Sequence, residues 1–224
     1  MKTVCSLIAV AVVGSVASAD VVSFQFAGVS RGNNVGIAVN GGSYQNVFSG
    51  SVIHNIDGQR TVTFCIDPDQ YAQKGTAEFQ RESLADALSH RGGALAKAWA
   101  IAEMAHAAGP DIWTETADKN LASAFQIAVW EVVMDLDAEI GLSSLSLSGG
   151  AFKAQGTSNS SLSSGVSSIV NQLFGSISFD SMKLGKFEAY TNSAHQDFMT
   201  MVPAPGSMLL SLAALPLIAT RRRK

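Results

Sequence analysis

The stretch SVIHNIDGQRTVTFCI, residues 51–66, predicts a β-hairpin and is the clearest structural signal in the chain. Asp57-Gly58 separates two runs rich in β-branched and aromatic residues, and this dipeptide favours the two-residue turn that joins antiparallel strands. Because side chains alternate along a strand, Phe64 and Cys65 are expected to point to opposite faces of the sheet. The hairpin therefore places a cysteine near the end of a strand.

Cys65 is one of two cysteines, and the other, Cys5, lies in an N-terminal segment that we expect to be removed. Pro68 cannot continue a central strand, so the strand should end just beyond Cys65. An exported chain with one cysteine cannot form an internal disulfide. A lone cysteine is most often a small buried hydrophobe, which is the simplest interpretation of Cys65.

The segments around the hairpin predict strands first, helices next and strands last. Residues 20–67 show strand-like alternation and turn signals, and this alternation returns in residues 176–192. The alanine-rich residues 79–108 are expected to be helical, with a break at Gly92-Gly93. This order predicts a single α+β domain with N-terminal β-hairpins, a central helical insert and C-terminal strands.

Three further elements are expected after the first helical region. A second helix should begin after Asp118, a suitable N-cap, and continue through residues 119–137. Residues 142–165 are rich in Ser and Gly and predict a long loop. Apolar residues at helical spacing in residues 166–173 predict a short helix that ends at Gly175.

The second helix contains one polar residue on its apolar stripe. Gln126 shares this stripe with Ala122, Val129, Trp130 and Val133. Burying a primary amide is costly unless its polar atoms are hydrogen-bonded. Gln126 is therefore a core glutamine bonded to backbone, a glutamine displaced to the edge of the stripe, or a functional side chain.

The N-terminus has the pattern of a secretory signal peptide in residues 1–19. Lys2 precedes an apolar run over residues 4–13, and small residues lead to a cleavage site after Ala19. The apolar run is too short to predict a membrane anchor. The mature chain is expected to begin at Asp20.

The C-terminus resembles the PEP-CTERM sorting signal of Gram-negative envelopes, which joins a short motif, an apolar helix and an arginine-rich end. The motif here is VPAP, in which Val202, Pro203 and Pro205 match the family and Ala204 stands where Glu is usual. An apolar stretch over residues 206–220 follows, and the chain ends in RRRK.

This resemblance implies that residues 203–224 form a sorting segment. The segment would hold the exported chain transiently in the inner membrane, with its basic end at the cytoplasmic face. A sorting peptidase would then cleave near Pro203 to Pro205. The expected localisation is therefore the cell envelope or the exterior of a Gram-negative bacterium.

Removing both ends leaves an acidic protein. Of the 15 Lys and Arg residues, 10 remain, against all 18 Asp and Glu residues. A negative surface repels phosphate backbones, and the sequence shows no basic stripe with interleaved aromatic residues. We therefore expect no nucleic-acid partner.

Two short motifs connect Cys65 with Gln126. TFCID at residues 63–67 and FQIAVWEVV at residues 125–133 resemble the two motifs of the bacterial thioester domain. The resemblance extends over about residues 25–202, because the helical insert of that family also lies between the motifs. It implies that the Cys65 thiol attacks the Gln126 carbonyl, that ammonia is lost, and that an internal thioester links strand to helix.

The residues around this pair would have to support the reaction. Backbone N–H groups after Pro68, or an Asn or Tyr side chain, are candidates for stabilising the developing oxyanion. Asp67 belongs to the cysteine motif. Phe64, Phe125 and Trp130 are candidates for excluding water, and each is equally suited to an ordinary core position.

The resemblance implies covalent attachment without turnover, so the domain of residues 20–202 is expected to be neither an enzyme nor dependent on a cofactor. An amine of a partner, most simply a lysine side chain, would attack the Gln126 acyl carbon and release Cys65. Gram-positive relatives are adhesin-like. With a sorting tail, the expected partner is an amine-bearing surface protein or a component of the cell's own matrix or envelope.

Three alternatives remain open from the sequence. In the first alternative, the domain is a structural matrix protein that forms no covalent bond. In the second, it is a cysteine hydrolase. A hydrolase needs a histidine base, and none of the available histidines lies in a recognisable hydrolase motif: His54, His90, His106 and His195. The third is a metal site at Asp57, Asp67 and Asp69, whose spacing is not that of a calcium loop and which suit turn or capping roles better.

Overall fold

The hairpin expected at Asp57-Gly58 is present in the computed structural model, which describes residues 20–179 and 187–202. Strand β2 (Gln45–Ile56) pairs antiparallel with β3 (Gln59–Cys65). Asp57 and Gly58 both have positive φ, at 49° and 82°. Positive φ at both central residues is what a type I′ turn requires, so this prediction is confirmed.

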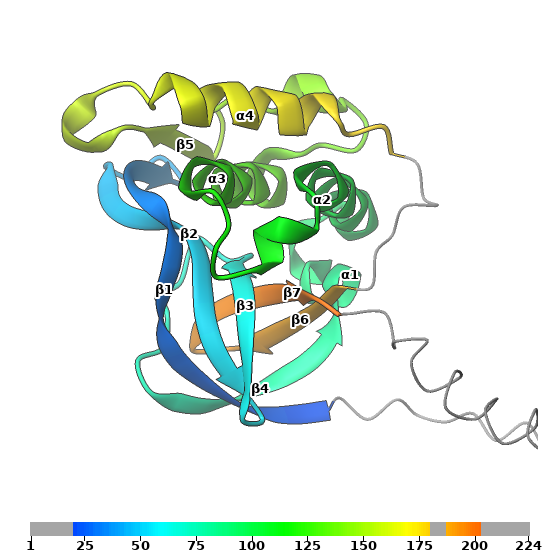
Figure 1. Cartoon of the computed structure of the whole chain (residues 1–224). Coiled ribbons are helices and arrows are strands. Elements are labelled where there is room, and N and C mark those ends of the chain that lie inside the picture. The colour runs from blue at the N-terminus through cyan, green and yellow to red at the C-terminus, as the bar shows by residue number, and fades with distance from the viewer. Residues whose placement is uncertain (1–19, 180–186, 203–224) are drawn as a thin grey trace, which may run out of the picture.

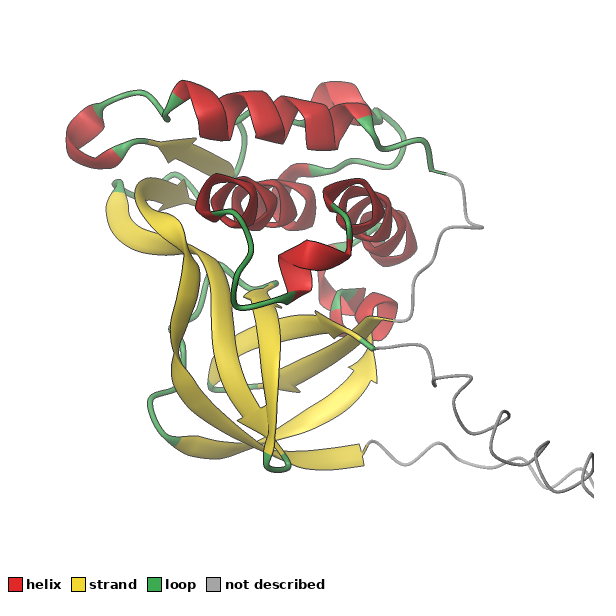
Figure 2. Ribbon diagram, viewed as in Figure 1, coloured by secondary structure: helices red, strands yellow, loops and turns green. Residues whose placement is uncertain are grey.

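The strands close into a barrel (Figures 1 and 2). The long strand β1 (Asp20–Val39) pairs with β2 on one side and with β4 (Thr76–Ser83) on the other. Strand β4 then pairs with β6 (Phe187–Asn192), β6 with β7 (His195–Met201), and β7 with β3. Within the described residues, these pairings form a closed ring of six antiparallel strands. Each of the six strands therefore has a hydrogen-bonded neighbour on both sides.

The inside of the barrel is filled by aromatic rings around one histidine. The ring of His54 lies 4.2 Å from Phe24 and 4.4 Å from Phe198, measured between centroids. Its Nδ1 atom is 2.8 Å from the hydroxyl of Thr63. Burial lowers the pKa of His54 to about 3, so the imidazole is neutral at physiological pH.

A pair of glycines lets β1 and β2 approach closely where they leave the barrel. Gly32 lies opposite Gly50, next to an irregularity in the pairing. A Cβ atom on Gly32 would lie 2.1 Å from the carbonyl oxygen of Ser49, and one on Gly50 would lie 2.1 Å from that of Arg31. No other residue type fits this contact, and beyond it the two strands continue towards the helices.

The helices cover one end of the barrel (Figure 2). In Figure 1, α2 (Ala94–Ala108) and α3 (Lys119–Asp135) lie next to the strands, and α4 (Ser164–Gly175) lies on their outer side. Helix α3 contacts β1, β2 and β3 as well as α2 and α4. Because it is enclosed by other elements, α3 is buried along most of its length.

Local signals for the helix ends are confirmed. The Asp118 carboxylate accepts hydrogen bonds of 2.9 Å from the backbone N–H groups of Asn120 and Leu121. These bonds satisfy two of the amides that a helix start leaves free. Helix α4 ends at Gly175, as expected.

Three secondary-structure predictions are wrong in part. Of the predicted strand residues 176–192, residues 176–179 lie outside any strand and residues 187–192 form β6. Residues 79–83 belong to strand β4 and not to a helix, which begins only with α1 (Leu84–Ala87). Pairing with β1 and β6 overrides the local helical preference there. The predicted loop at 142–165 contains strand β5 (Phe152–Gln155), which pairs with the end of β1 beyond the barrel.

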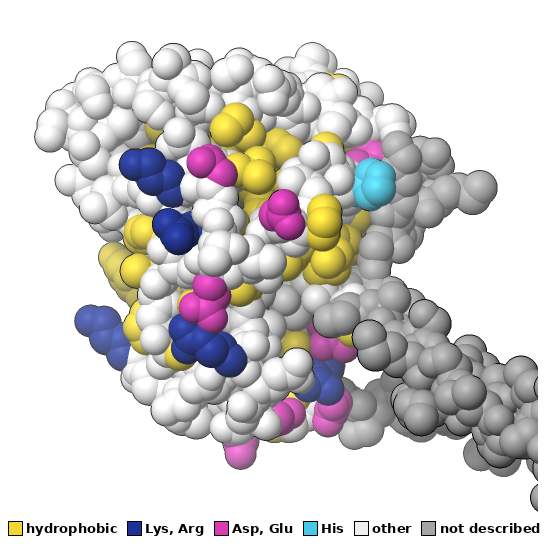
Figure 3. All heavy atoms as spheres, in the orientation of Figure 1, with side chains coloured by type: hydrophobic (Ala, Val, Ile, Leu, Met, Phe, Trp, Pro, Cys, Tyr) yellow, Lys and Arg dark blue, Asp and Glu magenta, His cyan; other side chains and the backbone are white. Residues whose placement is uncertain are grey.

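The α+β architecture is confirmed, whereas the predicted terminal signals lie outside the described residues. Ala19, Pro203 and Pro205 are among the residues not described, and Val202 is the last that is. No helix within residues 20–179 and 187–202 is long and apolar enough to cross a membrane. On the face in Figure 3, Lys and Arg side chains lie among Asp and Glu side chains over the barrel, and the surface over α4 is mostly uncharged.

One buried carboxyl group in α3 predicts a pH-dependent stability. Glu131 is fully buried, and its Oε1 atom accepts a hydrogen bond from the N–H of Ser146, whereas its Oε2 atom has no hydrogen-bond partner among the described residues. Burial raises the pKa of Glu131 from 4.5 to about 8. The folded state therefore keeps a proton that the unfolded chain releases, so the free energy of unfolding falls as pH rises through this range.

We expect Glu131→Gln to weaken this dependence. The variant should be more stable than the wild type at about pH 9, by on the order of 1–3 kcal/mol, and closer to it at about pH 6. Urea unfolding at both pH values measures the difference. Asp197, whose pKa is also raised, to about 7, is present in both proteins and cancels in the comparison. An equal difference at both pH values would contradict the assignment to Glu131.

Candidate functional site

Cys65 lies where β3 leaves the barrel. It is the last residue of β3 and pairs with Phe198 in β7, and its side chain is 3% exposed. The next residue is also held, because the N–H of Ile66 donates to the carbonyl of Asp197 at 2.9 Å. Pro68 follows two residues later, as the sequence indicated, and the chain turns away from the sheet.

The Gln126 side chain is bound directly by the backbone of Cys65. The N–H of Cys65 donates to Gln126 Oε1 at 2.9 Å, and Gln126 Nε2 donates to the carbonyl of Cys65 at 2.8 Å. Gln126 comes from the middle of α3 and is 1% exposed. Of the three interpretations left open by the sequence, the structure shows the core glutamine bonded to backbone, and that backbone is the one of Cys65.

This pairing supplies an oxyanion donor that the sequence did not indicate. If a nucleophile attacks the side-chain carbonyl of Gln126, negative charge develops on Oε1. The N–H of Cys65 already donates to that atom. Of the predicted donors, the first N–H after Pro68 is engaged elsewhere, because the N–H of Asp69 donates to the Asp67 carboxylate at 3.1 Å.

The Cys65 sulfur is held by two further donors. Trp130 Nε1 donates to Sγ at 3.2 Å, and the N–H of Asp67 donates to it at 3.3 Å. The thiol in turn lies 3.3 Å from the carbonyl of Asp67, to which it donates. Trp130 follows Gln126 by one helical turn, so the two side chains lie on one face of α3 and meet the same cysteine.

The electrostatics keep the thiol protonated in this state. Burial raises the pKa of Cys65 strongly, and the hydrogen bonds from Trp130 and Asp67 oppose this rise. The carboxylates of Asp67 and Asp197 raise the pKa further. The site therefore stores a neutral thiol next to donors that are ready to stabilise negative charge on sulfur.

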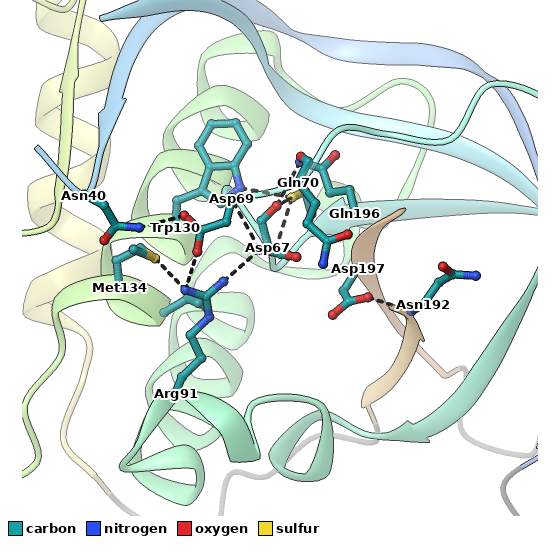
Figure 4. A network of polar contacts seen from close by, with 12 residues as sticks. Asn40, Asp67, Asp69, Gln70, Arg91, Trp130, Met134, Asn192, Gln196 and Asp197 are labelled. Carbon is teal, nitrogen blue, oxygen red and sulfur yellow. Dashed lines mark hydrogen bonds and ion pairs between the residues drawn. The ribbon is translucent and has the colours of Figure 1, made fainter. Parts of the chain in front are cut away.

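Arg91 anchors the turn that follows Cys65 (Figure 4). Its Nη2 atom lies 2.7 Å from an oxygen of Asp67, and its Nη1 atom lies 2.7 Å from an oxygen of Asp69. The amide of Gln196 adds bonds to the carbonyls of Asp67 and Gln70, at 3.0 and 3.1 Å. Because Asp67 contacts the sulfur through its backbone, these bonds fix the position of Sγ.

A cavity of about 460 Å³ leads to the pair. Cys65, Gln126 and Trp130 line it, together with residues of β1, β2, the turn between them, the loop after β3 and Gln196 of β7. The loop approaches β2 through the hydroxyl of Tyr71, which is 3.4 Å from Gln45 Oε1. The otherwise buried pair is thus reached through this cavity.

The predicted screening residues separate into two groups. Trp130 contacts the sulfur and lines the cavity. Phe64 and Phe125 pack on each other, with ring centroids 4.9 Å apart, and both contact the ring of Trp113. Because Phe64 and Cys65 alternate on β3, this aromatic cluster lies behind the site and supports it as core.

The residues considered for other chemistry have structural contacts. Asp57 accepts a hydrogen bond from the N–H of Ser23, and Asp67 and Asp69 both pair with Arg91. Among the described residues, no group of three or more His, Cys, Asp or Glu side chains is arranged to hold a metal ion. His54 is enclosed in the barrel, and in the described part of the chain the sulfur's hydrogen-bond partners are Trp130 and Asp67.

Comparison with protein-family models, with curated proteins and with solved structures finds no match to this chain.

Proposed function

We propose that this protein is exported to the envelope or exterior of a Gram-negative cell and attaches covalently to amine-bearing partners through an internal Cys65–Gln126 thioester. The single observation that carries the proposal is the pair of hydrogen bonds between the Cys65 backbone and the Gln126 side-chain amide. The N–H of Cys65 lies 2.9 Å from Oε1, and Nε2 lies 2.8 Å from the carbonyl oxygen of Cys65. The two residues lie 61 positions apart in the chain. Any residue could supply backbone groups to bind a core glutamine, but here that residue is Cys65, the only cysteine in the described residues.

The reaction requires no reagent from outside. The sulfur attacks the Gln126 carbonyl carbon, a carbon–sulfur bond forms, the carbon–nitrogen bond breaks, and the thiol proton leaves with ammonia. The N–H of Cys65 stabilises the oxyanion, and rigid strand and helix hold the reactants in place. The low exposure of both residues protects the thioester from water.

Attachment then reverses the roles of the two residues. A neutral amine attacks the acyl carbon of Gln126, and the sulfur leaves. Trp130 and the N–H of Asp67 stabilise the departing thiolate, which takes up the proton released by the amine. The partner is joined through an amide bond, and the protein reacts once.

The alternatives receive less support from the contacts at the site. A hydrolase needs a base beside the nucleophile, whereas His54 is committed to Thr63 and surrounded by aromatic rings. A non-reactive matrix protein accounts for the bonded glutamine but not for the two donors that converge on the sulfur.

Intact mass of the purified protein tests the proposal. We expect the processed chain to be lighter than its sequence by one ammonia, and methylamine to raise the mass by one amine, with the label on Gln126. Denaturation in alkali should restore a free thiol by hydrolysis. A protein with the full sequence mass that takes up no methylamine would refute the thioester and leave the non-reactive matrix role.

A further inference from the structure

The cavity that leads to Cys65 and Gln126 is lined mainly by apolar side chains. Its wall is formed by β1 and β2 residues that include Phe26, Val29, Ile37, Val47 and Val52. A volume of about 460 Å³ lies within the range of small-molecule sites. The cavity therefore has room for the carbon chain of an amine whose nitrogen reaches Gln126.

The charged part of the lining already has hydrogen-bond partners. Within the described residues, Asp69 is the only charged side chain that lines the cavity. One of its oxygens pairs with Arg91 at 2.7 Å, and the other accepts a hydrogen bond from Asn40 at 3.0 Å. A cation that enters would find no free carboxylate, so it would lose hydration without a partner.

Two of the side chains that line the cavity are also exposed to solvent. Val29 is 56% exposed and Tyr71 is 81% exposed, and both line the cavity. Gln126 and Cys65 are almost completely buried, and they line the same cavity as these two side chains. These two exposed side chains continue the apolar lining outward, where an acceptor would contact them.

From these observations, and resting on the proposed thioester, we propose that the cavity selects primary amines carried on an unbranched apolar arm and discriminates against amines with a second charge close to the first. The arm would pack along the β1 and β2 wall. The apolar surroundings would also favour the neutral, nucleophilic form of the amine over its ammonium form. The amine nitrogen forms the new bond to the Gln126 carbon, and the sulfur leaves as the thiol.

Competition among three amines tests this selectivity on the thioester-bearing protein. The probes are methylamine, n-butylamine and the diamine isostere of n-butylamine, in which an ammonium group replaces the terminal methyl. Second-order rates of capture are measured by intact mass and expressed per unprotonated amine. We expect n-butylamine to react at least about tenfold faster than methylamine, and its diamine isostere at least about tenfold slower than n-butylamine.

Val29→Asp tests whether the wall causes the selectivity. Because Val29 is exposed, the substitution should preserve the fold and place an unpaired carboxylate beside the arm. We expect the preference for n-butylamine over the diamine to fall about tenfold. Ile140→Asp is the matched control, since Ile140 is 61% exposed and does not line the cavity. Should Val29→Asp fold poorly, Val29→Thr keeps the shape of the side chain and should reduce the preference in the same direction.

The outcomes separate this inference from the proposed function. Full sequence mass in the wild type would refute the thioester and the inference with it. Loss of ammonia together with equal rates for the three amines would overturn only the selectivity. The selectivity would also be overturned if Val29→Asp and Ile140→Asp changed the ratio of the n-butylamine rate to the diamine rate equally.

Discussion

Replacing Cys65 with alanine is expected to abolish amine capture completely while the barrel and helices still form. The variant lacks the thiol of the residue whose backbone binds the Gln126 amide, so its mass should equal that of its sequence, with no loss of ammonia. The backbone bonds to Gln126 do not involve the side chain and should persist. The N–H of Trp130 loses its acceptor, which should lower the free energy of unfolding by about 1–3 kcal/mol.

Two companion variants make the result specific to the reaction. Cys65→Ser keeps an acceptor for Trp130 and should recover most of the stability, but a hydroxyl is too weak a nucleophile to attack an amide without a base. Gln126→Met removes the electrophile and should also abolish capture. Mass spectrometry with methylamine and urea unfolding measure the two properties. Capture by Cys65→Ala would show that another residue carries the reactive group.

Trp130→Phe is expected to slow both formation of the thioester and its reaction with amines. The substitution keeps an aromatic ring in the core and removes the N–H that donates to the sulfur at 3.2 Å. A hydrogen bond to a charged group contributes about 1.5–3 kcal/mol, so a developing thiolate without this donor should react about ten to a hundred times more slowly. Time courses of mass change after methylamine addition measure the effect.

Trp113→Phe is the matched control for that variant. Trp113 lies in the aromatic cluster with Phe64 and Phe125, and its Nε1 atom has no hydrogen-bond partner among the described residues. The control makes the same chemical change without touching the sulfur. It should therefore leave the rates within about twofold of the wild type. Equal slowing in both variants would assign the effect of Trp130→Phe to packing.

The parts of the site that could be predicted are those with a local or motif-based signal. Cys65, Asp67 and Gln126 belong to two short motifs, and Trp130 follows Gln126 at helical spacing. Arg91 had no such signal, because it lies in a segment where Gly92-Gly93 indicated only a helix break. Its role arises because the chain returns to the turn after β3, where Arg91 pairs with the carboxylates of Asp67 and Asp69.

The errors in secondary structure have a similar origin. Residues 79–83 include a single core side chain, Phe79, and carry no strand pattern strong enough to compete with the helical segment that follows. Their conformation comes from β1 and β6, which lie on either side. Strand β5 likewise forms because the end of β1 extends beyond the barrel and offers an edge to pair with.

The sequence by itself determined the elements whose causes are local. The Asp57-Gly58 turn, the Asp118 cap and the end of α4 at Gly175 depend on the conformations that individual residues favour. Only the tertiary structure decided that the barrel closes, that Arg91 holds the turn beside the sulfur, and that an apolar cavity leads to the pair. These features depend on contacts between distant segments, which become favourable only when burial of the shared core offsets the entropy of bringing those segments together.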